Sequence, residues 1–400
     1  MLKLYILTLL LVFFLFINTK TTSAVDPETG MTVPEIITYH GYPAEEHFVT
    51  TNDGYILGIH RIPHGKGMKS SEKRQVIFLQ HGLLCSSADW IVNPVNESLA
   101  FMLADAGFDV WLGNSRGNTY SRSHKTLKVE SDAFWKFSWD SMASEDLPAV
   151  IEYIVSETGQ QQLHYAGHSQ GTMIAFAGFS RNKVLSKRIK KFYALAPVAY
   201  LGHMESPLKY LASFIPEIEW LFKILGVRDF LPQSPLITWL ASHMCTKSVL
   251  KSVCANIVFV ICGYDKPQMN ETRLDVYMTH SPAGTSVHNM VHYAQAYKTG
   301  NFQMYDWGEK ENLERYNQST PPLYDLSNFH VPTVLYYGGH DWLADIKDVN
   351  VLLKKLPSGV VKLQKLVDSW MHLDFIWGMD APQEVYRSLI ADALEDNKNY

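Results

Sequence analysis

Short apolar runs recur along the chain, and several of them end in glycine-containing loops. The runs are Gln75–Gln80, Phe108–Leu112, Gln162–Ala166, Phe192–Ala196, Val334–Tyr337 and Val361–Leu366. Continuous apolar runs of this length are typical of strands buried on both faces of a sheet. Helical patterns over 144–158 and 172–181 lie between them. Strands that alternate with helices predict an α/β fold with a mostly parallel central sheet flanked by helices.

A hairpin is expected before the first of these buried strands. His47–Pro63 contains two strand-like runs on either side of Asn52-Asp53-Gly54. An Asp-Gly pair between two such runs is a strong turn signal, because these residues tolerate the backbone conformations of tight hairpins.

The strand–helix alternation stops between Tyr200 and about Leu323. Five apolar residues in this stretch recur at intervals of three and four: Leu211, Phe214, Ile218, Leu221 and Leu225. This stripe marks one apolar helix face, which an ordinary core helix would also show. Because the stretch falls between two core strands, we predict a helical cap over 201–324 and a core formed by 25–200 and 325–400.

The first residues resemble a secretory signal peptide. Lys3 precedes the apolar run Leu4–Ile17, and Thr22-Ser23-Ala24 offers a small-residue cleavage site. The alternative is a membrane anchor, but the run has about 14 residues and a spanning helix needs roughly 20. We therefore predict a cleaved signal peptide over 1–24 and a secreted protein without a transmembrane segment.

Composition narrows the classes of partner. The net charge is −5 and no long Lys/Arg run is present, so we expect no nucleic-acid partner. Behind a signal peptide, the N-x-S/T triplets at Asn96, Asn270 and Asn317 are predicted glycosylation sites.

The chain has four cysteines: Cys85, Cys245, Cys254 and Cys262. In an oxidising compartment, one disulfide that closes a short loop is expected. Sequence spacing alone does not choose the pair.

The central motif is Gly167-His168-Ser169-Gln170-Gly171, a G-x-S-x-G sequence between an apolar run and a helical pattern. In that context it predicts a sharp strand-to-helix turn that presents a nucleophilic serine, with glycines where side chains would clash. The turn also places Ser169 at a helix N-terminus, which favours developing negative charge. A chance match is the alternative, since the motif is short, but its position favours an α/β-hydrolase nucleophile.

A serine hydroxyl needs a base, and the base needs a carboxylate to orient it. In α/β-hydrolases the chain order is serine, acid, histidine. Asp341 follows the apolar run Val334–Tyr337 and is the candidate acid, whereas Asp345 lies farther past the strand end. His372 follows the last predicted strand and is the candidate base. His340 is too close to Asp341 in sequence to serve.

Two backbone N–H groups are expected to stabilise the oxyanion. One belongs to Gln170, the residue after the nucleophile. The other comes from the loop His81-Gly82-Leu83-Leu84 after an early strand. We expect Leu83 to donate, with Leu84 as the alternative.

Beyond these motifs, many segments of the chain resemble the acid lipase family. The matching segments are 41–43 (GYP), 53–65 (DGYILGIHRIPHG), 79–84 (LQHGLL), 109–118 (DVWLGNSRGN), 167–172 (GHSQGT), 192–199 (FYALAPVA), 281–290 (SPAGTSVHNM), 305–308 (YDWG), 320–326 (TPPLYDL) and 372–386 (HLDFIWGMDAPQEVY). They cover nearly the whole chain after the predicted signal peptide. Together they are far more specific than any single motif.

The resemblance implies the same triad and the oxyanion donors Leu83 and Gln170. It further implies a disulfide between Cys245 and Cys254, a free Cys262, and a mobile lid at about 231–262 within the cap. Cys85 has no counterpart. The family implies hydrolysis of neutral lipid esters in acid, without a metal or other cofactor.

We therefore expect a secreted lipase acting on neutral lipid esters at a lipid–water interface, with the lysosome as the alternative destination and a monomer as the expected state. A triad alone does not name a substrate. The alternatives are an esterase for short-chain, retinyl or cholesteryl esters, and a non-catalytic lipid-binding homologue. The insertion contains large apolar residues: Trp220, Leu221, Phe222, Ile224, Leu225, Leu236, Ile237, Trp239 and Leu240. They fit a cap that covers an apolar cleft and equally fit packing of the cap against the core, and the resemblance to the family favours lipid.

Two departures from the family pattern concern the catalytic acid and base. His340 precedes Asp341 where relatives often carry Asn or Gln, and a charged histidine there would lower the basicity of the carboxylate. The segment between Asp341 and His372 is slightly longer than in a member of the family.

Overall fold

The computed structural model describes residues 26–69, 73–213, 226–233, 262–263 and 266–396. The predicted signal peptide, the pair Cys245–Cys254, most of the predicted lid and most of the apolar stripe after Tyr200 lie outside the described residues. Within the described part of the chain, no helix has the length and apolar character needed to cross a membrane.

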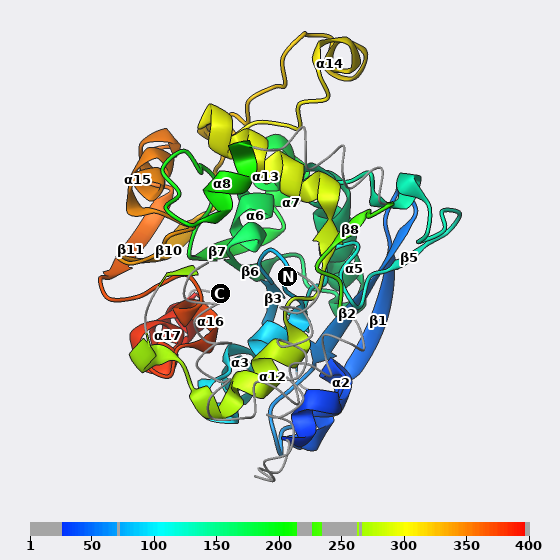
Figure 1. Ribbon diagram of the computed structural model, residues 1–400. Helices are drawn as coiled ribbons and strands as arrows, with labels where there is room; N and C mark the ends of the chain where they lie inside the picture. Colours follow the sequence, from blue (N-terminus) through cyan, green and yellow to red (C-terminus); the bar gives the residue numbers. More distant parts are fainter. Residues whose placement is uncertain (1–25, 70–72, 214–225, 234–261, 264–265, 397–400) are drawn as a thin grey trace, which may run out of the picture.

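A central sheet organises the described residues (Figure 1). Its strands are β1 Glu45–Thr50, β2 Tyr55–Ile62, β3 Val76–Gln80, β4 Asp109–Leu112, β5 Ser123–His124, β6 Leu163–His168, β7 Ile189–Leu195, β10 Thr333–Gly338 and β11 Val361–Val367. Their order is β1-β2-β4-β3-β6-β7-β10-β11, with β5 beside β2. The pairs that involve β2 are antiparallel, and every pair from β4 to β11 is parallel.

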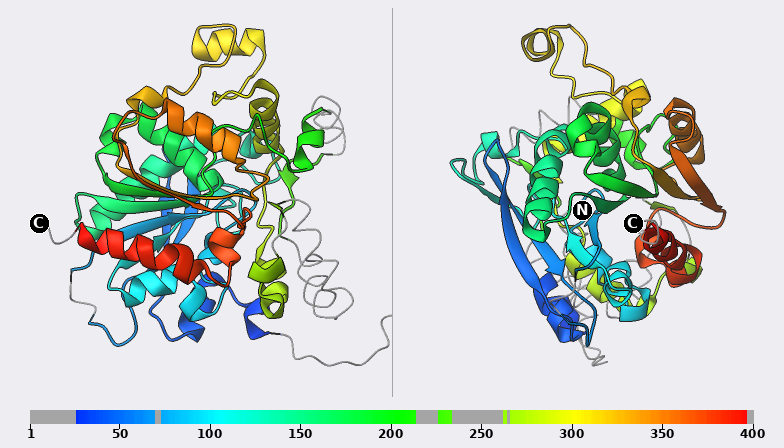
Figure 2. Two further views of the ribbon diagram at one scale, coloured as in Figure 1. Left: turned by 90° about the vertical axis from the view of Figure 1, so that its left-hand side faces the viewer. Right: turned by 180° about the vertical axis from the view of Figure 1, so that it is seen from behind.

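Helices cover both faces of this sheet. The main ones are α3 Leu99–Asp105, α5 Leu147–Thr158, α6 Gln170–Arg181, α15 Ile346–Lys355 and α17 Arg387–Glu395. In the left-hand view of Figure 2, α15 and α17 lie on opposite sides of the strands. Shorter helices are α2 Val33–Tyr39, α4 Trp139–Ser141, α7 Lys183–Ser186 and α16 Asp374–Trp377. The predicted fold class is confirmed.

All the predicted strands are present, and the differences are local. The central strands β3, β4 and β6 are completely buried, as continuous apolar runs require. The last strand, β11, lies at the sheet edge and is largely exposed. The helix predicted over 144–158 is regular only from Leu147. A π-helical turn, Met142–Asp146, precedes it, and Pro148 lies in its first turn, where the missing N–H costs nothing.

The described part of 201–324 combines helices with irregular segments. It contains α8 Leu208–Ser213, α12 Leu274–His280, α13 Val287–Thr299 and α14 Glu309–Tyr316. The same region contains a two-stranded antiparallel ribbon, formed by β8 Asp229–Phe230 and β9 Thr285–Ser286. The sequence pattern did not predict this ribbon. Helices α8, α12 and α13 lie across one end of the sheet, and α14 projects away from the body (Figures 1 and 2).

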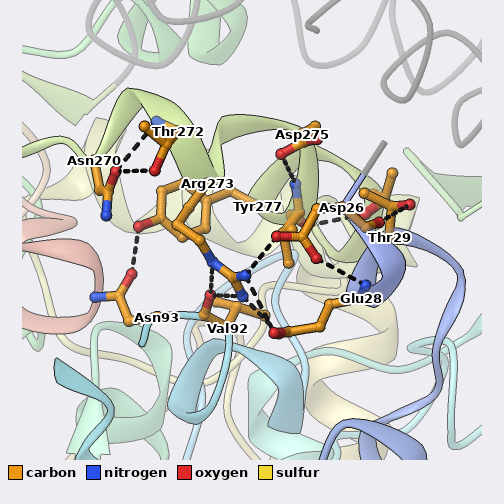
Figure 3. A network of polar contacts seen from close by, with 12 residues as sticks. Asp26, Glu28, Thr29, Val92, Asn93, Asn270, Thr272, Arg273, Asp275 and Tyr277 are labelled. Carbon is orange, nitrogen blue, oxygen red and sulfur yellow. Dashed lines mark hydrogen bonds and ion pairs between the residues drawn. The ribbon is translucent and has the colours of Figure 1, made fainter. Parts of the chain in front are cut away.

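A buried ionic cluster fastens α12 to the rest of the molecule (Figure 3). Arg273, immediately before α12, lies 2.5 Å from a carboxylate oxygen of Glu28 and 2.9 Å from one of Asp26. Its Nε donates to the carbonyl oxygen of Val92 at 2.9 Å. Burial alone would raise the pKa of Glu28, but hydrogen bonds from His40 and Arg273 hold it below its usual value. The cluster thus joins three segments that are distant in sequence.

Candidate active site

Ser169 sits in the sharp turn between β6 and α6. Its backbone has φ 52° and ψ −117°, a strained conformation for a residue with a side chain. A Cβ on Gly167 would lie 2.8 Å from the backbone of Gly171, and one on Gly171 would lie 2.3 Å from the carbonyl oxygen of Gln80. Glycine is therefore required at both positions, as the motif predicted.

The fold brings Ser169, His372 and Asp341 together from three separate loops. The Ser169 Oγ lies 2.8 Å from Nε2 of His372, and the Asp341 carboxylate lies 2.8 Å from Nδ1 of the same ring. All three side chains are buried. Oδ1 of Asp341 also accepts hydrogen bonds from the backbone N–H groups of Leu343 and Ala344, at 2.9 and 2.7 Å. These bonds hold the carboxylate in the orientation in which it faces the His372 ring.

The two rivals for acid and base have other roles. Asp345 caps the N-terminus of α15 by accepting a hydrogen bond from the N–H of Lys347 at 2.7 Å. His340 is exposed, and its backbone N–H donates to the carbonyl oxygen of Trp370 at 2.9 Å. The hydrogen-bond partners of the Asp341 carboxylate are thus His372 and the two backbone N–H groups of Leu343 and Ala344.

The loop after β3 lies directly beside the serine. A Cβ on Gly82 would lie 3.1 Å from Cβ of Ser169 and 3.0 Å from the ring of His168, so a side chain here would displace one of these neighbours. Leu83 follows in the same loop and lines the cavity described below. Leu84 has a positive φ of 61°, and its carbonyl oxygen accepts a hydrogen bond from Ala283 at 2.6 Å.

Two neighbours of the triad were not identified from the sequence. The side chain of Gln170 accepts a hydrogen bond from Asn289 of α13 at 2.8 Å, which ties the start of α6 to the cap region. His168 Nε2 lies 2.9 Å from the carbonyl oxygen of His372. Because burial lowers the pKa of His168 to about 3, its ring is neutral and donates this bond. Asn289 lies within a matched family segment, but nothing in the spacing indicated its partner.

The triad opens onto a cavity of about 560 Å³. Its walls combine the loop after β3, the segment after β7, α8, α12 and α13. The apolar lining includes Leu83, Leu84, Val198, Leu201, Met204, Leu208, Phe230, Leu231, Met278, Val287, Met290, Val291, Leu343, Leu373 and Trp377. Cys85 and Cys262 also line it, and both are free thiols. The volume and the apolar lining suit a large apolar group beside the serine.

The other candidate residues are distributed over the surface. Asn96 and Asn317 are exposed, and Asn270 is half-buried with its Oδ1 bonded to Thr272 (Figure 3). Among the described residues, no group of three or more His, Cys, Asp and Glu side chains is arranged to hold a metal ion.

Comparison with known proteins places this geometry in a family. Residues 75–379 match the model of the alpha/beta hydrolase fold, and 33–94 match that of the partial alpha/beta-hydrolase lipase region. The chain is 52% identical to human lysosomal acid lipase/cholesteryl ester hydrolase over 370 residues, 92% of each chain. It is 51% identical to human gastric triacylglycerol lipase over 374 residues, 93% of each chain.

A solved structure supports the same fold at lower similarity. A soluble variant of monoglyceride lipase from Saccharomyces cerevisiae superposes with a TM-score of 0.52 at 15% identity, covering 93% of this chain and 97% of that one. That likeness concerns the architecture alone. The sequence identity to the two human enzymes decides the family: the chain belongs to the acid lipases, carboxylic ester hydrolases with the α/β-hydrolase fold.

Proposed function

We propose that this chain is a secreted lipase that hydrolyses carboxylic esters of neutral lipids, triacylglycerols and sterol esters among them. The observation that carries the proposal is the hydrogen-bonded Ser169–His372–Asp341 array opening onto an apolar cavity of about 560 Å³. The names of the relatives, one a triacylglycerol lipase and one a cholesteryl ester hydrolase, support the same substrate class.

In the acylation step, Ser169 attacks the ester carbonyl while His372 takes the hydroxyl proton. Asp341 holds the ring with Nδ1 protonated and stabilises the imidazolium that forms. The developing oxyanion receives hydrogen bonds from the backbone N–H groups of Leu83 and Gln170. His372 then donates its proton to the leaving alcohol, and the acyl group stays on Ser169.

In the deacylation step, His372 removes a proton from water, which attacks the acyl-enzyme. The same two N–H groups stabilise the second oxyanion. Collapse of this intermediate releases the fatty acid and returns the proton to Ser169. Burial of all three side chains strengthens each of these electrostatic interactions.

The region 201–324 acts in this proposal as a cap that supplies much of the acyl-binding wall. Met278 of α12, together with Met290 and Val291 of α13, lines the cavity. The proposed lid at 231–262 would uncover this surface at a lipid–water interface. Glycosylation at Asn96, Asn270 and Asn317, and a disulfide between Cys245 and Cys254, remain part of the proposal.

The proposed route is secretion, with the lysosome as the alternative. Relatives that share half of the sequence are named for the stomach and for the lysosome, and both names agree with this expectation. The oligomeric state that we propose is a monomer.

The deciding experiment measures fatty-acid release from emulsified long-chain triacylglycerol by the secreted protein between pH 4 and pH 7. Ser169→Ala is the control, since it removes the nucleophile and leaves the buried array otherwise packed. We expect release by the wild type and at least a thousandfold less by the variant. Equal activity of the two proteins would refute the proposed mechanism.

The substrate panel separates the alternatives. Turnover of short-chain, retinyl or cholesteryl esters without turnover of triacylglycerol would keep the triad and change the substrate. A folded protein that is silent on every ester would be a lipid-binding homologue.

A further inference from the structure

We propose that His81 is a positioning residue that sets the oxyanion hole by fixing the peptide group between Gly82 and Leu83. The inference rests on the proposed function, because it takes Leu83 as an oxyanion donor. His81 follows β3 and is buried. It does not line the cavity, so it acts on the reaction only through its neighbours.

The hydrogen bonds of His81 define its protonation state. Its Nε2 lies 3.0 Å from the backbone N–H of Ser115 and 3.2 Å from the side-chain amide nitrogen of Asn118. A backbone N–H can only donate, so Nε2 is the acceptor and the proton resides on Nδ1. Burial lowers the pKa of His81 to about 4, which keeps the ring neutral.

The proton on Nδ1 is directed at the loop itself. Nδ1 lies 2.7 Å from the carbonyl oxygen of Gly82, and the ring therefore donates to that oxygen. The N–H of Cys85 donates to the same oxygen at 3.3 Å. The carbonyl of Gly82 is thus held from two sides.

This carbonyl belongs to the same peptide group as the N–H of Leu83. The group is planar and trans, so its C=O and N–H point in opposite directions. Fixing the oxygen of Gly82 therefore fixes the direction of the Leu83 N–H. The close approach of Gly82 to Ser169 places this peptide beside the nucleophile.

The support for His81 comes from the loop after β4, which carries Asn114-Ser115-Arg116-Gly117-Asn118. Asn118 donates to the carbonyl oxygen of Cys85 at 3.3 Å as well as to His81. Gln80 donates to the hydroxyl of Ser115 at 3.1 Å. The loop after β4 therefore holds both ends of the oxyanion loop in place. Through His81, these contacts also fix the peptide group between Gly82 and Leu83.

Three substitutions at His81 test the proposal. His81→Asn keeps an amide N–H near the position of Nδ1, whereas His81→Gln places its amide near Nε2 and loses the donor to Gly82. His81→Ala removes both. The matched control is His164→Asn, because His164 is another buried histidine, with a pKa lowered to about 3, outside the site.

The readouts are kcat and KM on a water-soluble short-chain ester, and the affinity for an alkylboronic acid that forms a tetrahedral adduct with Ser169. We expect His81→Gln and His81→Ala to lower kcat about 10- to 100-fold, part of the loss seen when an oxyanion donor is removed outright. KM should change less than about twofold, since the bonds strengthen only in the transition state. The boronic acid affinity should fall by the same factor as kcat.

The conservative variant His81→Asn distinguishes a positioning role of His81 from a role in packing alone. His81→Asn should recover most of the lost kcat, and His164→Asn should leave kcat unchanged. Equal loss in the Asn and Gln variants, or a kcat loss without weaker boronic acid binding, would overturn the proposal. If His81→Ala does not fold, the Asn and Gln pair still decides, and Asn118→Ala should show a smaller loss of the same kind.

The outcome is distinguishable from failure of the proposed function. If Ser169→Ala retains activity, the catalytic mechanism itself is refuted. If Ser169→Ala is inactive and the His81 variants behave like the wild type, only the positioning role is refuted.

Discussion

At the scale of single residues, the geometry of the site depends on a glycine, Gly171, whose position leaves no room for a side chain. A Cβ on Gly171 would approach backbone atoms of both Gln80 and His81, at 2.3 to 3.0 Å. Backbone cannot move aside as a flexible side chain can. Gly171 therefore sets the distance between α6, which Ser169 directly precedes, and the end of β3, which leads into the proposed oxyanion loop.

We expect Gly171→Ala to lower kcat at least 10-fold and to destabilise the protein by about 1–3 kcal/mol, the usual cost of overpacking. The reason is that α6 and the end of β3 must separate, which moves Ser169 away from Leu83, the proposed oxyanion donor in the loop after β3. Ester hydrolysis and the thermal midpoint measure the two effects.

Gly178→Ala, in the same helix, is the control. Its Cβ would meet a side-chain methyl of Leu147 at 2.8 Å, which can shift, and a backbone atom only at 3.2 Å, the carbonyl oxygen of Ala143, so kcat should be unchanged. Wild-type kcat in Gly171→Ala would show that this contact does not control the site.

At the scale of elements, α12 is held by charge as well as by apolar packing. Arg273 and Glu28 pair in a buried position, and α12 contributes Met278 to the cavity wall. The cluster therefore connects the segment before α2 to the wall of the candidate site (Figure 3). Breaking a buried pair leaves a charge without compensation.

We expect Arg273→Met to lower the free energy of unfolding by about 3–5 kcal/mol, because Glu28 stays buried with His40, at 3.0 Å, as its one remaining partner among the described residues. The double variant Arg273→Met with Glu28→Gln should recover part of this loss, since it removes the buried charge that Arg273 no longer compensates. Chemical denaturation gives both values.

The exposed pair Arg188–Glu152 provides the comparison. Arg188→Met should change the free energy of unfolding by less than about 1 kcal/mol, as surface ion pairs do. An equally small effect of Arg273→Met would argue against the buried cluster as a fastening of α12.

At the scale of the whole molecule, buried titratable groups couple stability to pH. Burial lowers the pKa of five buried histidines to about 3 or 4: His60, His81, His164, His168 and His292. In the unfolded chain a histidine takes up its proton near pH 6.5. Burial raises the pKa of Asp89 and Asp140 to about 6, and these two carboxyls act in the opposite sense.

We expect the thermal midpoint to fall by about 5 °C or more between pH 7 and pH 4. The contribution of each neutral imidazole is complete above pH 6.5 and is lost as the pH falls toward about 3, because the unfolded chain binds protons first. Asp89 and Asp140, and the further carboxyls with a raised pKa, Glu97, Glu145 and Asp146, contribute stability as the pH falls through part of this range. The five histidines act in the opposite sense together with His288, whose pKa is lowered to about 3, and with Glu28, Glu45 and Asp53, whose pKa values are also lowered, and this group is the larger one.

Calorimetry at pH 4 and pH 7 measures this difference. His164→Asn should show a smaller fall than the wild type, since it lacks one of the five groups. A midpoint that is equal or higher at pH 4 would contradict the prediction and would assign the dominant role to the buried carboxyls.

Much of this molecule follows from local patterns. Apolar runs located the strands of the sheet, and Gly167-His168-Ser169-Gln170-Gly171 located the turn that presents the serine. Asp341 and His372 followed from chain order, because parallel strands that end at one edge of a sheet bring their following loops together. Each of these patterns spans only a few neighbouring residues or depends on chain order, so it can be recognised from the sequence alone.

Other features depend on contacts between distant segments. His81 meets Ser115 across 34 residues, Gln170 meets Asn289 across 119, and Arg273 meets Glu28 across 245. A lone histidine, asparagine or arginine carries no periodic signal that would identify such a partner.

The sequence by itself therefore determined the fold class, the family and the three residues that meet as a hydrogen-bonded array, because strand periodicity and chain order act over short ranges. The tertiary structure decided which side chains brace the oxyanion loop, what fastens α12 and which groups line the cavity. The physical reason is that hydrogen bonds and desolvation depend on the distances between atoms in space, and these distances exist only once the chain has folded.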